Sequence, residues 1–310
     1  MQVLEKQIMD LRSVSLKQLR YFIATAETGQ LSKAAHSTHV SQSAITAAIK
    51  SLESLMKVRL FDRQQLGVSL TAEGHRFYLR AKEVLDLLED AIREPRYNVY
   101  NLQGSVKVSA SYTVLGYFLP NLLARFRANY PDVEIDLHDK KRLDIEQAVK
   151  DGSTELGIVI LSNSTNLSPF SHHVLIRSRR QLWLSATHPL LKQEQVSLND
   201  ISKYPYILIT EDEGEESTRR YWQANGEQLN IGFKTSSMEG LRGLIAYSFG
   251  LTILSDMIYR PWSLEGKKIE TRPILNQVPD MQVGIIWKKG AVLSKPAQAM
   301  RELLIQICGS

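Results

Sequence analysis

Three helical patterns of apolar residues crowd into the first 56 residues and are followed at once by two short strand-like runs. The apolar residues of the first pattern are Leu16, Leu19, Phe22, Ile23 and Ala26. Gly29 predicts the end of this helix, and a short second helix is predicted over 31–37. Ser41 supplies an N-cap oxygen for a third helix, whose apolar stripe includes Ile45, Ile49 and Leu52. A tight turn at His39-Val40 separates the last two helices, which predicts a helix-turn-helix.

The other face of the third predicted helix carries short or polar side chains. They are Gln42, Ser43, Thr46, Ala47 and Lys50. A glutamine can bond an adenine edge in two places, and serine or threonine can reach base edges or phosphates. Ser41 and Lys50 are better suited to phosphates, which set the register of a protein on DNA. An ordinary solvated helix face has a similar composition, so this pattern alone leaves both interpretations open.

The residues after the third helix favour DNA binding. Leu60 to Arg63 predicts a strand, residues 64–67 a turn, and Val68 to Leu70 the returning strand. A hairpin in this place is a wing, and it would put Arg63 beside a phosphate or the minor groove. Residues 15–80 hold nine Lys/Arg and four Asp/Glu, a net charge of +5 where a phosphate backbone would need it. The predicted DNA-binding residues are Ser32, Ser41, Gln42, Ser43, Thr46, Lys50 and Arg63.

A long proline-free segment from Ala72 to Glu94 follows the predicted wing. Its apolar residues Phe77, Ala81, Val84, Leu88 and Ala91 are separated by steps of four, three, four and three, which is a heptad seam. Such a seam can pack on its own body or pair two helices of a dimer, and we favour dimerisation. Pro95 ends the helix, and residues 95–104 are predicted to form a hinge.

From residue 105 onward, strand-like and helix-like runs alternate. Strands are predicted at 106–110, 133–137, 156–160, 181–185, 206–210, 232–235, 251–255 and 282–287. Helices are predicted at 117–129, 145–151, 216–225, 238–249 and 296–308. This alternation indicates parallel sheets in an α/β fold.

The sequence lacks the motifs of common enzyme sites. It has no phosphate-binding glycine loop, no G-x-S-x-G elbow and no metal-spaced cysteine set. Cys308 is the single cysteine, which rules out an intrachain disulfide. There is no apolar run suited to a secretory signal or a membrane span. We therefore expect a cytoplasmic protein that is not an enzyme, binds no cofactor or metal and has no membrane partner.

The order of these motifs resembles the LysR-type transcriptional regulators. The matching residues are Leu16-x-x-Leu19-x-x-Phe22, Ala34-Ala35, Val40-Ser41-Gln42-Ser43-Ala44-Ile45-Thr46, Ile49-x-x-Leu52-Glu53, Leu60-Phe61-x-Arg63 and Leu70-Thr71-x-x-Gly74. A weaker match continues at Leu119-Pro120, Tyr130-Pro131, Gly152-x-x-x-Leu156, His188-Pro189-Leu190 and Gly250 to Leu254. Ala47 and Ala48 depart from the family, whose members often carry larger polar or basic side chains there, so the operator sequence is hard to infer.

The resemblance implies a mixed α/β fold with a winged helix-turn-helix, a long linker helix and a two-lobed effector domain like periplasmic binding proteins. The implied divisions are an N-terminal extension (1–14), the winged helix-turn-helix (15–71), a linker helix (72–94), a hinge (95–104) and the effector domain (105–310). The first lobe would comprise about 105–161 and 263–308, and the second about 162–262.

The resemblance also implies a mechanism. A homodimer paired through the linker helices, joined to a second dimer, would bind promoter DNA and control access for RNA polymerase. A small-molecule effector, expected to be a small carboxylate or related metabolite, would bind between the lobes. Position matching gives the effector residues as Ser109, Ser111, Tyr112, Thr113, Ser162, Thr210, Glu211 and Ser237. Helix capping is the competing interpretation for each serine and threonine.

Other interpretations remain at this point. The acidic run from Glu211 to Glu216 is typical of a solvated helix start, but it also fits an effector with an amine group. A solute-binding protein of a transport system would share the two-lobed fold, but the 15–80 segment argues against it. An enzyme with a DNA-binding front end would need a catalytic constellation that the sequence does not offer.

Overall fold

The computed structural model describes residues 14–64, 67–93 and 102–308. The chain divides into two compact units, unit 1 (Met1–Asn98) and unit 2 (Val99–Ser310). Among the described residues, no helix combines the length and apolar character needed to cross a membrane.

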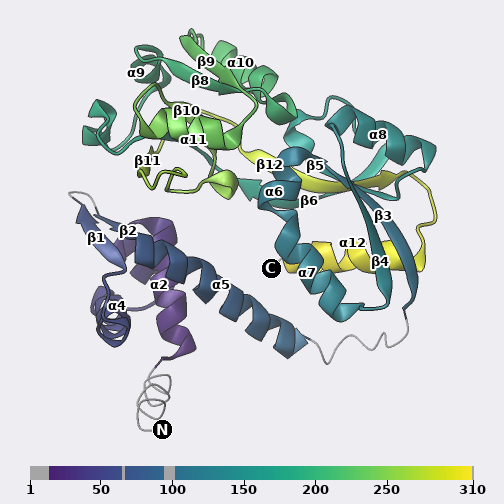
Figure 1. Cartoon of the computed structure of the whole chain (residues 1–310), viewed down its shortest axis with the longest axis horizontal. Helices are drawn as coiled ribbons and strands as arrows, with labels where there is room; N and C mark the ends of the chain where they lie inside the picture. The colour runs from purple at the N-terminus through teal and green to yellow at the C-terminus, as the bar shows by residue number, and fades with distance from the viewer. Residues whose placement is uncertain (1–13, 65–66, 94–101, 309–310) are drawn as a thin grey trace. The chain divides into compact units, whose positions relative to one another are not determined.

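Unit 1 is a bundle of short helices followed by a hairpin and a long helix (Figure 1). Its elements are α2 (Leu16–Thr28), α3 (Leu31–Ser37), α4 (Gln42–Met56), β1 (Phe61–Gln64), β2 (Gly67–Leu70) and α5 (Ala72–Arg93). Ser15 begins α2 through a capping box with Gln18, and Gly29 ends it in the left-handed conformation. The three helices, the antiparallel hairpin and the long helix that the sequence predicts are therefore present.

Phe22 lies at the centre of unit 1 and is fully buried. Its ring centroid lies 5.2 Å from that of Phe61 in β1 and 4.9 Å from that of Phe77 in α5. One side chain of α2 thus joins the hairpin and the long helix to the same core, and aromatic pairs at this spacing stabilise a core beyond their buried area.

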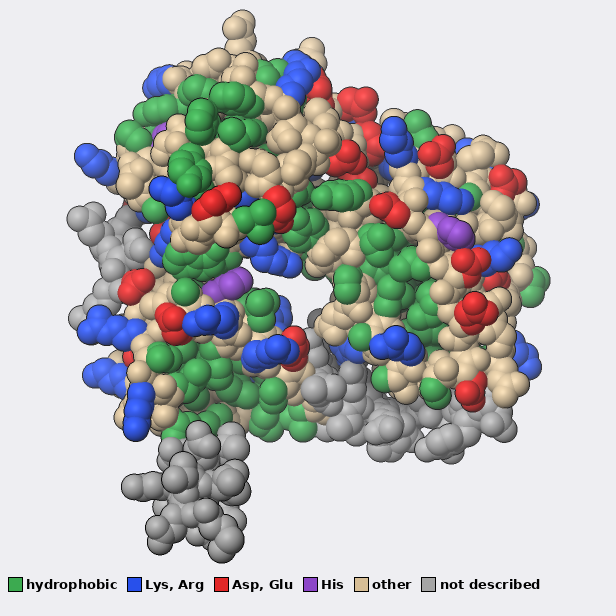
Figure 2. Space-filling model, viewed as in Figure 1, with side chains coloured by type: hydrophobic (Ala, Val, Ile, Leu, Met, Phe, Trp, Pro, Cys, Tyr) green, Lys and Arg blue, Asp and Glu red, His purple; other side chains and the backbone are tan. Residues whose placement is uncertain are grey.

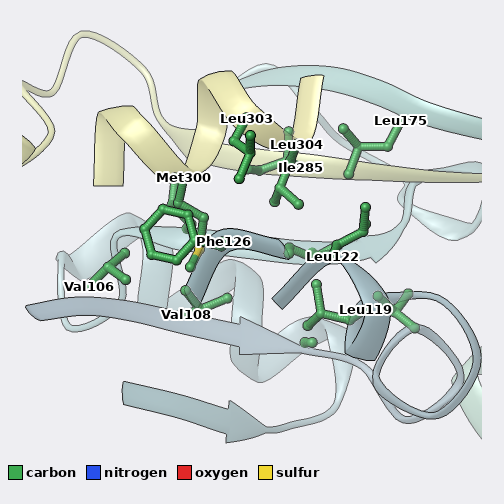
Figure 3. Packing of buried hydrophobic residues seen from close by; sticks show 14 of the residues in the cluster. Val106, Val108, Leu119, Leu122, Phe126, Leu175, Ile285, Met300, Leu303 and Leu304 are labelled. Carbon is green, nitrogen blue, oxygen red and sulfur yellow. The ribbon is translucent and has the colours of Figure 1, made fainter. Parts of the chain in front are cut away.

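The first lobe of unit 2 is a five-stranded sheet with the order β4-β3-β5-β12-β6. Its strands are β3 (Gly104–Ala110), β4 (Val133–Asp139), β5 (Leu156–Ile160), β6 (Phe170–Ser178) and β12 (Met281–Lys288). Helices α7 (Leu119–Asn129) and α12 (Lys295–Cys308) cover one face, and α8 (Arg142–Asp151) covers the other. Figure 3 shows Phe126 of α7 packed beside Met300 of α12 over Val106 and Val108 of β3.

The second lobe has a three-stranded antiparallel sheet, β10-β7-β11, and a parallel pair, β8-β9. The strands are β7 (Arg180–Ser185), β8 (Tyr206–Ile209), β9 (Ile231–Thr235), β10 (Thr252–Ser255) and β11 (Ile269–Arg272). Its helices are α9 (Leu198–Ser202), α10 (Gly214–Ala224) and α11 (Met238–Ala246). Two buried clusters, one around Trp222 and one around Trp183, fill its core.

Three expectations for unit 2 need correction. The five-stranded sheet is mixed, because β12 runs antiparallel to β5 and β6 while β3 runs parallel to β4 and β5, and the β10-β7-β11 sheet is antiparallel. Strand β6 was not predicted, and it belongs to the first lobe although residues 162–262 were expected in the second. Strand β11 was not predicted either, and it pairs with β7 in the second lobe although residues 263–308 were expected in the first. Both assignments depend on backbone pairing with strands distant in the sequence.

Candidate functional site

Helix α4 has one buried face and one exposed face. Ile45, Ala48, Ile49 and Leu52 are buried, whereas Ser41, Gln42, Ser43, Ala47 and Lys50 are exposed. The Ser41 hydroxyl accepts a hydrogen bond from the Ala44 amide at 3.2 Å and lies 2.9 Å from the Ser43 hydroxyl. The Thr46 hydroxyl donates to the Gln42 carbonyl at 2.9 Å. The residues expected to face DNA therefore do share one side of α4.

The hairpin is fixed to the helices at two points. The Glu53 carboxylate of α4 accepts the amide of Leu60 at 2.7 Å and that of Phe61 at 3.3 Å. The Val68 amide donates to the Gly29 carbonyl at 2.8 Å. A Cβ on Gly67 would lie 2.2 Å from that carbonyl oxygen, so only glycine allows this approach. The wing is thereby held in a fixed position relative to α2 and α4.

Two other predicted DNA-binding residues lie at the edges of this surface. Ser32 is exposed on α3, where Gln30 holds the N-cap position. Arg63 lies in β1 opposite Val68, and its side chain is outside the described residues. Figure 2 shows Lys and Arg side chains along the edge of unit 1 that carries α4.

The predicted dimer seam is only partly available for pairing. Phe77 is half-buried and Ala81 is buried, and both pack in the core of unit 1 with Leu19 and Phe22. Val84 is 46% exposed, and Leu88 is half-buried. The Ala91 side chain lies outside the described residues. The alternative that the seam packs on its own protein thus accounts for Phe77 and Ala81, the first two seam positions.

The structure separates the predicted effector residues into two groups. Ser109 is buried inside the first lobe, where its hydroxyl lies 2.9 Å from that of Thr154. The Ser162 hydroxyl accepts the Gln282 amide at 3.2 Å, and the Ser237 hydroxyl accepts the Gly240 amide at 3.0 Å as the N-cap of α11. Capping or packing therefore accounts for these three hydroxyls.

The other group gathers where the lobes adjoin. Ser111 precedes α6 (Tyr112–Tyr117), a helix that the sequence did not predict, and its buried hydroxyl makes no hydrogen bond within the described chain. The Thr113 amide donates to the Asp212 carboxylate of the second lobe at 2.7 Å. Tyr112 is 41% exposed, and desolvation raises the pKa of its hydroxyl, followed by the charges of Tyr117, Glu211 and Glu239, with the charge of Arg242 opposing them. Thr210 is exposed at the end of β8.

Asp212 and Glu213 belong to η5 (Glu211–Glu213), a single turn between β8 and α10. Both have left-handed backbones, with φ values of 50° and 55°. For residues other than glycine this conformation costs roughly 1–2 kcal/mol each, so surrounding contacts must hold it in place. Those contacts come from the first lobe.

An ion pair between a buried arginine and a half-buried glutamate supplies one of these contacts. Glu213 Oε2 lies 3.3 Å from Arg142 Nε of α8, and Arg142 Nη1 donates to Glu146 at 2.7 Å. Burial raises the pKa of the Glu213 carboxyl, and the Arg142 charge only partly opposes this shift. In addition, the Asn163 side-chain amide donates to the Asp212 carbonyl at 2.7 Å.

A second contact between the lobes involves Tyr117 of α6 and Arg242 of α11. Arg242 is 1% exposed and donates to the Tyr117 hydroxyl and to the Ile258 carbonyl, both at 3.0 Å, while it pairs with Glu239. The guanidinium of Arg260 also lies 5.3 Å from the centroid of the Tyr117 ring. The sequence did not point to Arg142, Asn163 or Arg242, and Asp212 was noted only as one acid of the run at 211–216.

Comparison with known proteins identifies both units. A family described as bacterial regulatory helix-turn-helix protein, lysR family, matches residues 16–75, and the LysR substrate binding domain matches residues 101–309. The uncharacterized HTH-type transcriptional regulator YybE of Bacillus subtilis is 27% identical over 93% of this chain and 97% of its own length.

Solved structures agree with these matches. The LysR family transcriptional regulator HinK of Pseudomonas aeruginosa is 29% identical with a TM-score of 0.61, covering 95% of this chain and 98% of that chain. CbnR, crystallised in full length with its target DNA, is 20% identical with a TM-score of 0.55, covering 95% and 100%, and shares the fold. With two family matches that together span nearly the whole sequence, the chain belongs to the LysR family of transcriptional regulators.

Proposed function

We propose that this regulator recognises promoter DNA through the exposed face of α4, with Gln42, Ser43 and Thr46 reading bases. Ser32, Ser41, Lys50 and Arg63 would contact phosphates. The observation that carries this proposal is the division of α4 into a buried apolar face and an exposed polar face, with a wing fixed beside it. Thr46 and Ser43 would have to exchange their present hydroxyl partners for DNA, so Gln42 is the strongest base-reading candidate.

A gel-shift series tests this assignment. The DNA upstream of the regulator's own gene and of neighbouring genes is titrated with wild type, Gln42→Ala and Lys50→Ala in the presence and absence of competitor DNA. Gln42→Ala should weaken specific binding by about 1–3 kcal/mol and leave non-specific binding nearly unchanged. Lys50→Ala should weaken both and reduce the salt dependence by about one charge. Equal losses of specific and non-specific binding for Gln42→Ala would contradict base reading.

The effector is proposed to bind where the two lobes adjoin, next to Ser111 and Tyr112. The buried Ser111 hydroxyl without a partner supports this position, since buried polar groups usually have one. A small carboxylate could accept a hydrogen bond from this hydroxyl. A thermal-shift screen of small carboxylic acids tests the proposal, because a ligand that binds the folded state raises the melting temperature. Ser111→Ala should abolish the shift, whereas Ser162→Ala should keep it.

An effector with an amine group is the second candidate. After desolvation and Tyr117, the charges of Glu211 and Glu239 raise the pKa of the Tyr112 hydroxyl, while the charge of Arg242 lowers it. Two carboxylates that could pair with an amine therefore lie near the proposed position. Titration with matched acids, one amino-bearing and one plain, distinguishes the two classes. A preference for the amino acid would favour this candidate, and equal affinity would exclude it.

The regulator is further proposed to act in the cytoplasm as a dimer paired through α5, with two dimers joined through unit 2, and to change the access of RNA polymerase to the promoter. The structure of CbnR in complex with its target DNA supports direct DNA binding by this regulator. The effector must bind one conformation better than the other for any switching to follow.

A further inference from the structure

The acidic turn η5 of the second lobe contacts three separate elements of the first lobe. The Asp212 carboxylate accepts the Thr113 amide of α6, and the Asp212 carbonyl accepts the Asn163 side chain of η3 (Leu161–Asn163), both at 2.7 Å. Glu213 pairs with Arg142 of α8 at 3.3 Å. Residues 211–213 therefore span the junction between the lobes.

The Thr113 amide depends on this turn for its hydrogen bond. Thr113 is the second residue of α6, so no carbonyl of the helix can accept its N–H. Side-chain capping would be the usual substitute, but the Ser111 side chain does not cap this helix. The acceptor comes instead from Asp212, 99 residues further along the chain.

The turn itself is held in a conformation that it would not adopt alone. Asp212 and Glu213 are two consecutive residues with positive φ, and they interrupt the right-handed helical geometry between Glu211 and the start of α10 at Gly214. Arg142 Nε and Glu213 Oε2 are buried without a well-aligned hydrogen bond, so their pairing is not fully satisfied. The strained backbone of Asp212 and Glu213 and the poorly aligned Glu213–Arg142 pair both weaken this contact between the lobes, so it can open.

We propose that residues 211–213 form a strap that holds the two lobes together and releases the Thr113 amide when the lobes move apart. The proposal deepens the proposed function, since it concerns the regulation of the same cleft. On release, Asp212 and Glu213 can return to right-handed backbone angles, which would join η5 and α10 into one helix from Glu211 to Ala224. An effector can then act by strengthening or displacing the strap.

Amide hydrogen exchange of the full-length protein, with no effector added, tests the strap at single-residue resolution. Asp212→Ala should raise the exchange rate of the Thr113 amide by about tenfold or more, because its one acceptor is lost. Glu213→Gln should raise it less, since the turn loses its ion pair but keeps the Asp212 carboxylate. Glu216→Ala is the matched control, because Glu216 is an exposed acid of the same run at the start of α10.

The central strand β3 reports whether a variant has merely lost stability. Exchange at Val108, which is fully buried, should stay unchanged in all variants. If Asp212→Ala loosens Val108 as well, Asp212→Asn is used, because its neutral amide oxygen is a weaker acceptor than the carboxylate; Thr113 exchange should then rise less than in Asp212→Ala but still above wild type, with Val108 unchanged. A Thr113 rate equal to wild type, or a rate that rises only in step with Val108 or equally in Glu216→Ala, would overturn the proposal. No ligand is involved, so a carboxylate screen that finds nothing would count against the proposed effector and not against the strap.

Discussion

Glu53 links two parts of the DNA-binding unit through a single carboxylate. One of its oxygens accepts the backbone amides of Leu60 and Phe61, which lie at the start of the wing. Hydrogen bonds to a charged acceptor are stronger than neutral ones, and their loss leaves two partly buried N–H groups without an acceptor. This residue therefore positions the wing although it does not face DNA.

Replacing Glu53 with alanine should lower the free energy of unfolding of unit 1 by about 1–3 kcal/mol. Glu73→Ala is the control, since Glu73 makes only an exposed ion pair with Arg76 and such pairs contribute about 0–1 kcal/mol. Denaturant unfolding followed by circular dichroism measures both. Equal stability of the two variants would mean that Glu53 does not hold the wing.

The single cysteine offers a second prediction at the level of one residue. Burial raises the pKa of the Cys308 thiol to about 11, with the charge of Arg125 opposing it. At pH 8 roughly one thiol in a thousand is then ionised, against about a quarter for an unperturbed cysteine. Reaction with a thiol-specific disulfide reagent at pH 8 should be at least tenfold slower in folded protein than in guanidinium. Comparable rates would contradict the burial of the thiol.

The same shift has a defined sign for stability. Between about pH 8.5 and 11 the unfolded chain loses the thiol proton while the folded chain keeps it. The contribution of the protonated thiol to the free energy of unfolding is therefore fully present below about pH 8.5 and is lost as the pH rises to about 11. The variant Cys308→Ser should remove this part of the pH dependence.

At the start of α5, Gly74 has no room for a larger side chain. A Cβ on Gly74 would lie 2.0 Å from the Leu60 carbonyl oxygen, which belongs to the backbone and cannot move aside cheaply. Gly74→Ala should therefore push α5 away from the wing and cost about 1–3 kcal/mol. Scanning calorimetry should show a lower melting temperature for unit 1, by about 4–8 °C per kcal/mol.

Gly243→Ala provides the matched control. Gly243 lies within α11, and a Cβ there would meet nothing within 4 Å. Alanine is the better helix former by about 1 kcal/mol, so this variant should be as stable as wild type or more so. A melting temperature that fell in Gly243→Ala but not in Gly74→Ala would reverse the structural argument.

Elements with strong periodic patterns could be predicted from the sequence, whereas long-range pairing could not. Helix α4 and strand β5 have local signals, namely a 3.6-residue apolar stripe and a continuous apolar run. Strand β6 contains two adjacent exposed histidines, and its place at the edge of the first sheet depends on β12, more than a hundred residues later. Its lobe was therefore assigned wrongly.

The candidate effector site divides in the same way. Ser111 and Thr113 follow a predicted strand end, which is a local signal. Asp212 reaches Thr113 only because β8 ends beside α6 in the folded lobe pair. No local sequence pattern near either residue predicts this long-range contact. Ser109 was misplaced because its side chain lies on the Thr154 side of β3.

At the scale of the whole molecule, the proposed switching would require unit 1 and unit 2 to influence each other, and α5 is the last described helix of unit 1 before unit 2 in the sequence. Its outer surface still carries exposed apolar side chains, with Leu79 at 44% and Val84 at 46%. Single exposed apolar residues are common on monomers, so exposure alone does not show whether Leu79 or Val84 lies in a dimer contact. Their positions in the heptad pattern distinguish the two residues, because Val84 belongs to the predicted seam and Leu79 does not.

Substitution of these two residues by glutamate tests the proposed dimer directly. If α5 pairs through its seam, Val84→Glu would bury an unpaired charge in the interface, which is costly, and should shift the protein toward monomers at micromolar concentration. Leu79→Glu makes the same chemical change at nearly the same exposure and should leave the dimer intact. Sedimentation equilibrium measures both. The reverse result would place the pairing face on the other side of α5, and two intact dimers would place the dimer contact outside these positions.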